Sequence, residues 1–300
     1  MSRDVRLTSA DRVLFPADGI TKGDLFAYYE RVAPALVPHL CERPFTLKRY
    51  PHGIHGEVYF QKQVPRGAPP WLRTRRFTTH PRGGGSRQVD FALVDSPEAL
   101  LWAVQMNCVD MNAWYSRVDR PDRPDYVVFD FDPPDEPDAF DLAIEAALRL
   151  GELLDEVGLP GYPKTSGADG IHVLAPVKRR ATYEDTYAFA EAAARLLEAR
   201  HPGLVTTEWL KRKRDGVLLD HRQNGWGKTI ASVYSVRPRA GAPVSTPLRW
   251  EELRPGLRPR DFPRAAVLER IERHGDLYAP VLDEPHALGA AARRLARLAP

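Results

Sequence analysis

The 300-residue sequence has few cysteines and no long apolar run, and both features limit the classes of protein to which it can belong. Its apolar stretches are far shorter than the roughly 20 residues that a membrane helix needs, so we expect no membrane association. Cys41 and Cys108 stand alone, without disulfide or metal spacing, which predicts two free thiols in a reducing compartment. The first twelve residues lack an apolar core and a cleavage site, so a cytoplasmic protein is expected.

Lysine is also scarce: 35 of the 43 basic residues are arginine, and the formal net charge is only +3. So small a charge neither requires nor excludes a nucleic-acid partner. Arginine suits bidentate phosphate contacts, but a GC-rich genome would produce the same bias. The basic residues cluster at 66–87 and 211–214, which predicts either phosphate-facing patches or solvated surface.

The hydrophobic pattern mixes helix and strand periods without strict alternation, which predicts an α+β fold. Thr21 and Asp24 form a capping box at the start of a helix, and Ser96 with Pro97 begins a shorter one. Connections are short, so residues 1–300 are expected to form a single domain. Strands are expected at 45–50, 57–63, 87–94, 109–116, 126–132, on both sides of a turn in 161–177, and at 216–220; further helices are expected at 138–158, 182–200 and 262–275.

Two expectations rest on weaker signals. The strands over 109–116 and 126–132 look like neighbours in a sheet. Residues 67–87 have little periodicity, and three glycines at 83–85 predict a mobile loop there.

Two acids stand at the end of the apolar run YVVFDFDPP. Strand side chains alternate, so Asp130 and Asp132 share one face, about 6.5 to 7 Å apart, with Phe131 on the other. Like charges so close repel each other unless a cation lies between them, and hard divalent cations take carboxylate oxygens. Asp220 ends another apolar run in the same way. The acids predict a metal site if the strands meet, or else turn caps and partners of arginine.

The turn KTSGADGIHV is a candidate phosphate site. Gly167 and Gly170 would let backbone N–H groups approach phosphate, and Ser166 and His172 could donate to its oxygens. An ordinary hairpin with a buried histidine is an equally good interpretation. The Walker-type phosphate loop is excluded, because G-x-x-x-x-G-K-[ST] is absent.

Four segments closely resemble, in the same order, the polymerase domain of bacterial DNA ligase D and its stand-alone relatives, which belong to the archaeo-eukaryotic primase superfamily. They are DRVLFPADGITKGDLFAYYERVAP, VFDFDPP, KTSGADGIHV and LLDHRQNGWGKTIASVYSVRPRAGAPVSTPLRWEEL. The resemblance implies a primase-type α+β fold, with an RRM-like catalytic sheet packed against helices and a second, N-terminal sheet and helix part. It implies template-directed nucleotidyl transfer, with a preference for ribonucleotides, in end joining or gap repair.

The resemblance also assigns residues. By matching positions, Asp130 and Asp132 would hold two Mn²⁺ or Mg²⁺ ions, and Asp220 would hold the ion that activates the primer 3′-hydroxyl. The incoming NTP or dNTP would be held by Ser166, His172, Gln223 and Arg237, with Lys48 and Lys228 as further matches. Arg12 and Lys22 match a basic pair that binds a downstream 5′-phosphate, and Phe60 matches an aromatic residue that stacks near the template.

Three positions depart from the family pattern, and one of them is Arg12, which stands where lysine is usual and still suits phosphate. Asn112 stands where relatives often have histidine, which affects a contact to the nucleotide sugar. Asp169 replaces a lysine and removes one positive charge near the phosphates. The implied partners are DNA with gaps or 5′-phosphorylated ends, nucleoside triphosphates, Ku, and a separate or fused DNA ligase. We expect a nucleoid-associated monomer.

Two other functions stay open. One is a non-catalytic module that binds DNA ends or gaps, in which the acids hold no metal. The other is a phosphohydrolase with Asp130 as nucleophile; against it, Pro-Pro follows the motif, and the motif lies in mid-chain.

Overall fold

The computed structural model describes residues 5–79, 84–136 and 139–298. Its strands are β1 (Val13–Phe15), β2 (Ile20–Thr21), β3 (Pro44–Arg49), β4 (Tyr59–Gln61), β5 (Thr74–Thr79), β6 (Arg87–Leu93), β7 (Cys108–Trp114), β8 (Tyr126–Asp132), β9 (Tyr162–Thr165), β10 (Ile171–Pro176), β11 (Val205–Thr206), β12 (Val217–Leu219) and β13 (Thr229–Ala231). Its helices are α1 (Lys22–Leu40), α2 (Pro97–Gln105), α3 (Ala139–Val157), α4 (Tyr183–Arg200), α5 (Arg264–His274), α6 (Pro280–Asp283) and α7 (Leu288–Leu298). Within these ranges no helix is long and apolar enough to cross a membrane.

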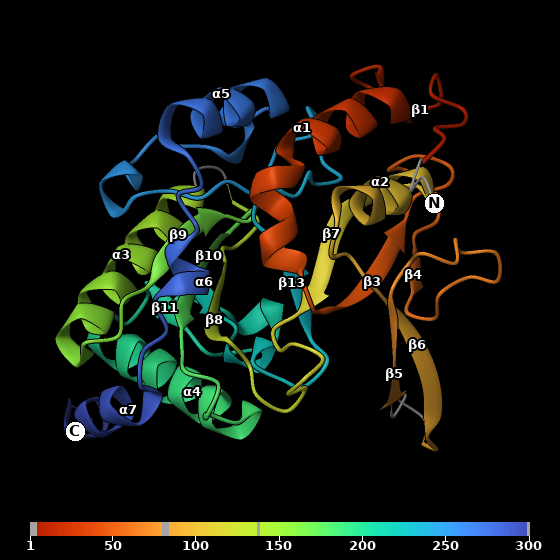
Figure 1. Ribbon diagram of the computed structural model, residues 1–300. Coiled ribbons are helices and arrows are strands. Elements are labelled where there is room, and N and C mark those ends of the chain that lie inside the picture. The colour runs from red at the N-terminus through yellow and green to blue at the C-terminus, as the bar shows by residue number, and fades with distance from the viewer. Residues whose placement is uncertain (1–4, 80–83, 137–138, 299–300) are drawn as a thin grey trace.

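Over the described residues, two larger sheets organise the fold (Figure 1). One sheet has the strand order β11-β12-β8-β10-β9, and the other has the order β13-β7-β3-β6-β5, with β4 paired to β3. Strands β1 and β2 form a small separate pair. Helices and strands are mixed without regular alternation, so the predicted α+β class, with a second sheet and helix part from the N-terminal half, is confirmed.

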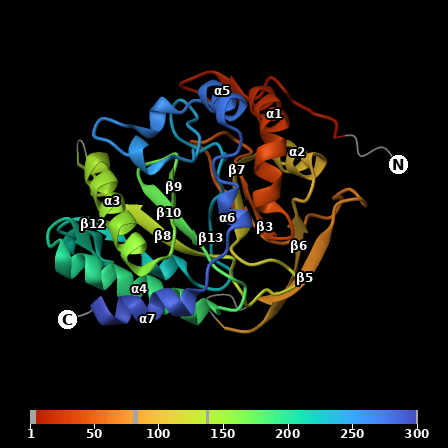
Figure 2. The same ribbon diagram turned by 60° about the vertical axis from the view of Figure 1, so that its left-hand side comes forward.

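Alternation along β8 decides what each face of the first sheet contacts. Phe129 and Phe131 are fully buried in a core with α3, α4 and α7, which cover the outer face (Figure 2). Val128, the residue before Phe129, points to the opposite face and belongs instead to the core shared with α1 and α2. Because side chains of even number point the same way, Asp130 and Asp132 also face the second sheet. The acids therefore lie between the sheets.

The helix starts follow the sequence signals. The Thr21 hydroxyl accepts a hydrogen bond from the Asp24 backbone N–H, the Asp24 carboxylate accepts one from the Thr21 backbone N–H, and α1 begins as predicted. Ser96 caps α2, with Pro97 in its first turn. A second capping box, at Thr182 and its partner three residues on, begins α4. The predicted helices are confirmed, because these caps are local and need no distant partner.

Two predictions about strands are wrong. β7 and β8 are not neighbours: β7 pairs with β3 and β13, whereas β8 pairs with β10 and β12. The segment 67–87 contains an unpredicted strand, since β5 pairs with β6 along its full length. β5 is largely exposed on both faces, so it shows no apolar period. The predicted mobile loop at 83–85 falls partly on residues outside the described ranges.

An ion-pair network joins the two sheets at the end of β8 away from its acids. Arg43, just before β3, is buried and pairs with Asp125, just before β8; it also donates to the Tyr115 carbonyl at 2.7 Å. Asp125 also contacts Arg117 and Arg179, each at 2.9 Å. One carboxylate thus compensates a buried guanidinium and links the two sheets.

Candidate active site

Strand register brings four polar side chains into one row across the first sheet. His172 on β10 lies opposite Lys164 on β9 and opposite Asp130 on β8. The next strand continues the row, because the backbone N–H of Asp220 donates to the carbonyl of Asp130 at 2.8 Å. Directly opposed residues have Cβ atoms about 4.5 to 5.5 Å apart, and the side chain of His172 contacts both Lys164 and Asp130.

Asp130 and His172, the two middle members of the row, line an open cleft of about 350 Å³ between the two sheets, whereas Lys164 and Asp220 at its ends lie outside the lining. Most of the predicted nucleotide and metal residues line it, although they come from distant segments. The cleft is lined by Lys48, Phe60, Asp110, Asn112, Asp130, Asp132, Ser166, Ala168, Asp169, Gly170, His172, Gln223, Thr229, Ile230, Ala231, Arg237 and Arg239. The fold thus brings together residues that are separated by up to 191 positions in the chain.

The three acids carry negative charge that the protein compensates only in part. Burial raises the pKa of Asp130, against the opposing charges of Lys164 and Arg237. Burial and then the charges of Asp130 and Asp220 raise the pKa of Asp132. Burial and Asp130 raise the pKa of Asp220 as well. Three mutually repelling carboxylates form an oxygen donor set that suits hard divalent cations.

The side chains of the three acids would have to move closer together to hold a metal ion. Within the described residues, the group of His, Cys, Asp or Glu whose ligand atoms all lie within 4.8 Å of one another is Cys41, Glu42 and Asp95, not Asp130, Asp132 and Asp220. Holding ions would therefore require the carboxylates of the cleft to turn inward. The Cys41 group has a simpler explanation, since Arg73 pairs with both of its acids.

The glycine turn after β9 packs closely against its surroundings. A Cβ at Gly170 would lie 2.1 Å from the Phe131 carbonyl, so no side chain fits there. Ser166 Oγ accepts from the backbone N–H groups of Ala168 (3.1 Å) and Gly170 (3.0 Å). Arg237 donates to the Ser166 carbonyl at 2.6 Å and so fastens the turn. The turn thus forms one wall of the cleft.

The opposite wall carries the positive charge. Lys48 on β3 donates to Asp110 on β7 at 2.8 Å, and the Arg237 Nε lies 3.9 Å from the same carboxylate. The Lys48 ammonium also lies 5.5 Å from the centre of the Phe60 ring. Gln223 also lines the cleft, and its side-chain amide opposes the rise in the pKa of Asp130. Cations and acids face each other across the cleft, as a site for a metal-bound triphosphate requires.

Three predicted basic residues lie outside the cleft lining. Lys228 is exposed and close enough to Asp220 to lower its pKa. Arg12 and Lys22 lie together near the end of β3, because Arg12 donates to the Pro51 carbonyl at 3.2 Å and its own carbonyl accepts from the Lys22 backbone. Lys22 is only 3% exposed, and burial followed by the charge of Arg12 lowers its pKa to about 8.

The two departures from the family pattern that line the cleft have local partners. Asn112 lines the cleft and donates to the backbone carbonyl of Asp110 at 3.1 Å. Asp169 pairs with Arg239 at the lip of the cleft, so the charge that it removes is partly restored. Sequence reasoning missed Asp110, Lys164 and Arg239. For Asp110 a signal existed: its i, i+2 spacing to Asn112 places both on one face of a strand.

Comparisons with known proteins agree with this geometry. A family model described as LigD, primase-polymerase domain, matches residues 21–278. The chain is 36% identical over 281 residues to a multifunctional non-homologous end joining protein LigD of Mycolicibacterium smegmatis, covering 92% of this chain and 36% of that protein. It is 34% identical over 287 residues to a bifunctional non-homologous end joining protein LigD of Bacillus subtilis, covering 94% and 45%. The chain therefore spans less than half the length of these relatives.

One solved structure is similar to this protein over almost the whole length of the chain. The polymerase domain from Mycobacterium tuberculosis ligase D, in complex with DNA, superposes with a TM-score of 0.86 at 34% sequence identity. The match covers 95% of this chain and 100% of that domain.

Proposed function

Because this chain belongs to the LigD primase-polymerase domain family, we propose that it is a template-directed nucleotidyltransferase of DNA repair. It would add nucleotides, with a preference for ribonucleotides, to a primer at gaps or broken ends. DNA with a 5′-phosphate and nucleoside triphosphates are the proposed ligands, and a Ku-type end-binding protein and a DNA ligase are the proposed partners. The observation that carries the proposal is one cleft in which Asp130 and Asp132 lie together with the candidate phosphate-binding side chains.

The residues of the cleft fit the requirements of phosphoryl transfer. Asp130, Asp132 and Asp220 would hold two divalent ions, which supply charge compensation at the attacking and leaving oxygens. Arg237, His172 and the turn at Ser166 lie where they would position the triphosphate. The primer 3′-oxygen would form a bond to the α-phosphorus of the nucleotide. The proton of the 3′-hydroxyl would leave to solvent, and the bond between the α-phosphorus and the pyrophosphate oxygen would break. The protein contributes mainly position and charge.

Primer extension tests the proposal. The substrate is a duplex with a one-nucleotide gap and a 5′-phosphate downstream, supplied with each of four NTPs or dNTPs and with Mn²⁺ or Mg²⁺. We expect addition of the nucleotide that pairs with the template base, faster with ribonucleotides. Tight binding of the gap without addition under any of these conditions would favour the non-catalytic module. Release of phosphate without template would favour the phosphohydrolase.

Phe60 gives a prediction about the template. Its ring is 69% exposed at the mouth of the cleft, an unusual position for phenylalanine that suits stacking on a base. Loss of one stacked base costs about 1 to 3 kcal/mol, so Phe60→Ala should weaken gap binding about 5- to 150-fold. Tyr59→Ala is the matched control, because Tyr59 points to the other face of β4 and should leave binding unchanged. Fluorescence anisotropy checks both, and equal effects of the two variants would contradict the stacking role.

The lowered pKa of Lys22 predicts that the preference for a 5′-phosphate depends on pH. Its pKa of about 8 means that the free ammonium is present below pH 8 and is lost above it. A 5′-phosphate binds the charged form, so binding takes up a proton at higher pH. The preference for a 5′-phosphate over a 5′-hydroxyl should therefore fall above pH 8, by up to about tenfold per pH unit.

Lys22→Arg supplies the control, because arginine stays charged. We expect its phosphate preference to be the same at pH 7 and pH 9.5. The prediction fails if wild-type protein also shows no change over that range, in a binding assay that compares the two gapped duplexes.

A further inference from the structure

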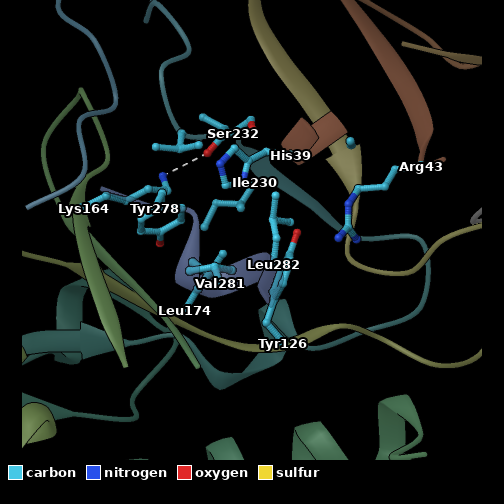
Figure 3. A pocket seen from close by; sticks show the side chains of 13 residues that line it. His39, Arg43, Tyr126, Lys164, Leu174, Ile230, Ser232, Tyr278, Val281 and Leu282 are labelled. Atoms are coloured by element: carbon cyan, nitrogen blue, oxygen red, sulfur yellow. Dashed lines mark hydrogen bonds between the residues drawn. The ribbon is translucent and has the colours of Figure 1, made fainter. Parts of the chain in front are cut away.

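Lys164 is a buried cation in the row of polar side chains that the reaction scheme above leaves without a role. It is only 1% exposed, and its ammonium lies 2.7 Å from Nδ1 of His172, 2.7 Å from Oγ of Ser245 and 3.0 Å from the carbonyl of Ala231. Figure 3 shows the side chain reaching from β9 toward Ile230 of β13 and Ser232 just after that strand, with one of these bonds drawn. It contacts no carboxylate directly among the described residues.

Burial lowers the pKa of Lys164, and the contacts around it assign the donors and acceptors for its ammonium form. The Ala231 carbonyl can only accept. The Ser245 hydroxyl donates to the Thr165 carbonyl at 2.8 Å, so its oxygen must accept from Lys164. These two bonds use two of the three ammonium protons. The third proton is directed at Nδ1 of His172, which therefore acts as the acceptor.

The other ring nitrogen then has a defined state. With Nδ1 accepting, a neutral His172 carries its proton on Nε2, which lies 3.2 Å from Oδ1 of Asp130. The opposite tautomer would set two donors against each other at Nδ1 and a lone pair against the carboxylate. A doubly charged pair would leave two cations 2.7 Å apart with no acceptor between them. The geometry thus selects one tautomer.

We propose that Lys164 is a positioning residue that holds His172 as its Nε2–H tautomer and so presents a fixed hydrogen-bond donor to the cleft. The donor points to the place where Asp130 and a triphosphate oxygen would meet. The identity of that ligand rests on the proposed function, whereas the tautomer follows from the protein alone. Lys164 also ties β9 to β13, so the same side chain sets the donor and the separation of the two cleft walls.

The surroundings explain why a lysine can occupy this position. On the side away from His172, Lys164 borders a small cavity of about 20 Å³ between the sheets, shared with His39, Tyr126 and Tyr278 (Figure 3). Such a volume holds about one water molecule, too little to solvate an ammonium. The cation therefore depends on its three fixed acceptors, and the histidine nitrogen is one of them.

Nitrogen NMR of His172 tests the inference in protein without ligand or DNA. With ¹⁵N-labelled histidine, the two ring nitrogens report directly which of them carries the proton. We expect wild-type protein to show the Nε2–H form of His172 alone, and Lys164→Met to show a mixture that includes the Nδ1–H form. A wild-type protein with the proton on Nδ1, or a Lys164→Met protein whose tautomer is unchanged, would overturn the proposal. The wild-type spectrum decides it even if the variant does not fold.

Ser245→Ala is the matched control for a purely structural role. It removes a different acceptor of Lys164 and leaves the contact with His172, so the tautomer should stay as in wild type while thermal stability falls. In primer extension, Lys164→Met should raise the KM for the nucleotide about ten- to a hundredfold, more than it lowers kcat, because a charge-assisted donor to phosphate is misplaced. If wild-type protein extends no primer, the proposed function fails while the NMR result still decides the role of Lys164.

Discussion

Replacing Asp130 and Asp132 together by alanine is expected to lower nucleotide addition at least about a thousandfold, equivalent to about 4 kcal/mol of transition-state stabilisation. These carboxylates are the main oxygen donors on the cleft floor, and the cations on the opposite wall already have other partners, such as Asp110 for Lys48. Nothing in the cleft replaces two negative charges at this place. The measurement is single-turnover extension of a gapped duplex with Mn²⁺.

The same acids are expected to destabilise the folded protein. The melting temperature can therefore separate a variant that has lost activity from one that has lost its fold. Burial and like charge raise the pKa of Asp132 above its unfolded value, so the folded protein binds more protons than the unfolded chain between the two values. Stability should fall as pH rises through that window. Asp132→Asn is therefore expected to raise the melting temperature at pH 7.5 in EDTA. Added Mn²⁺ should raise it for wild-type protein and less for Asp132→Asn.

Asp155→Asn is the control for these measurements, because Asp155 is an exposed acid on α3, on the outer side of the sheet. It should change neither extension nor the response to Mn²⁺. Wild-type extension by the Asp130→Ala/Asp132→Ala protein would contradict the two-metal assignment. Loss of extension together with a lower melting temperature would instead indicate damage to the fold.

The largest loss of stability is expected from Asp125→Ala, about 3 to 5 kcal/mol. Arg43 is 1% exposed, and its compensating carboxylate is Asp125. Removal of one partner of a buried ion pair leaves the other charge without compensation, which is far more costly than the loss of a surface pair. Because this network joins the two sheets that line the cleft, extension should fall as well. Urea unfolding measures the change in free energy.

Asp119→Ala provides a matched control at the same arginine cluster. Asp119 also pairs with Arg179, but its side chain is 60% exposed. Exposed pairs contribute about 0 to 1 kcal/mol, so this variant should unfold nearly as wild type does. Equal destabilisation by the two variants would show that burial of Arg43 is not what makes Asp125 important.

Sequence reasoning succeeded where the physical cause is local. The capping box predicted at Thr21 begins α1, and the helix expected at 182–200 begins at a capping box on Thr182; each box joins residues three positions apart. The shared face of Asp130 and Asp132 follows from the two-residue period of a strand, whatever the strand pairs with. The resemblance to a family then supplied most of the residues that the cleft brings together.

The sequence by itself thus determined the helices α1 to α5, the strands with apolar periods and the common face of the acids, whereas α6 and α7 were not predicted. Only the tertiary structure decided that β7 and β8 belong to different sheets, that β5 is a strand, and that Lys164 continues the row from His172. The reason is that backbone hydrogen bonds between strands are chemically alike at every position, so partner and register depend on packing of the whole chain. A lysine in a β-strand carries no sign of its neighbours until that packing places a histidine 2.7 Å away.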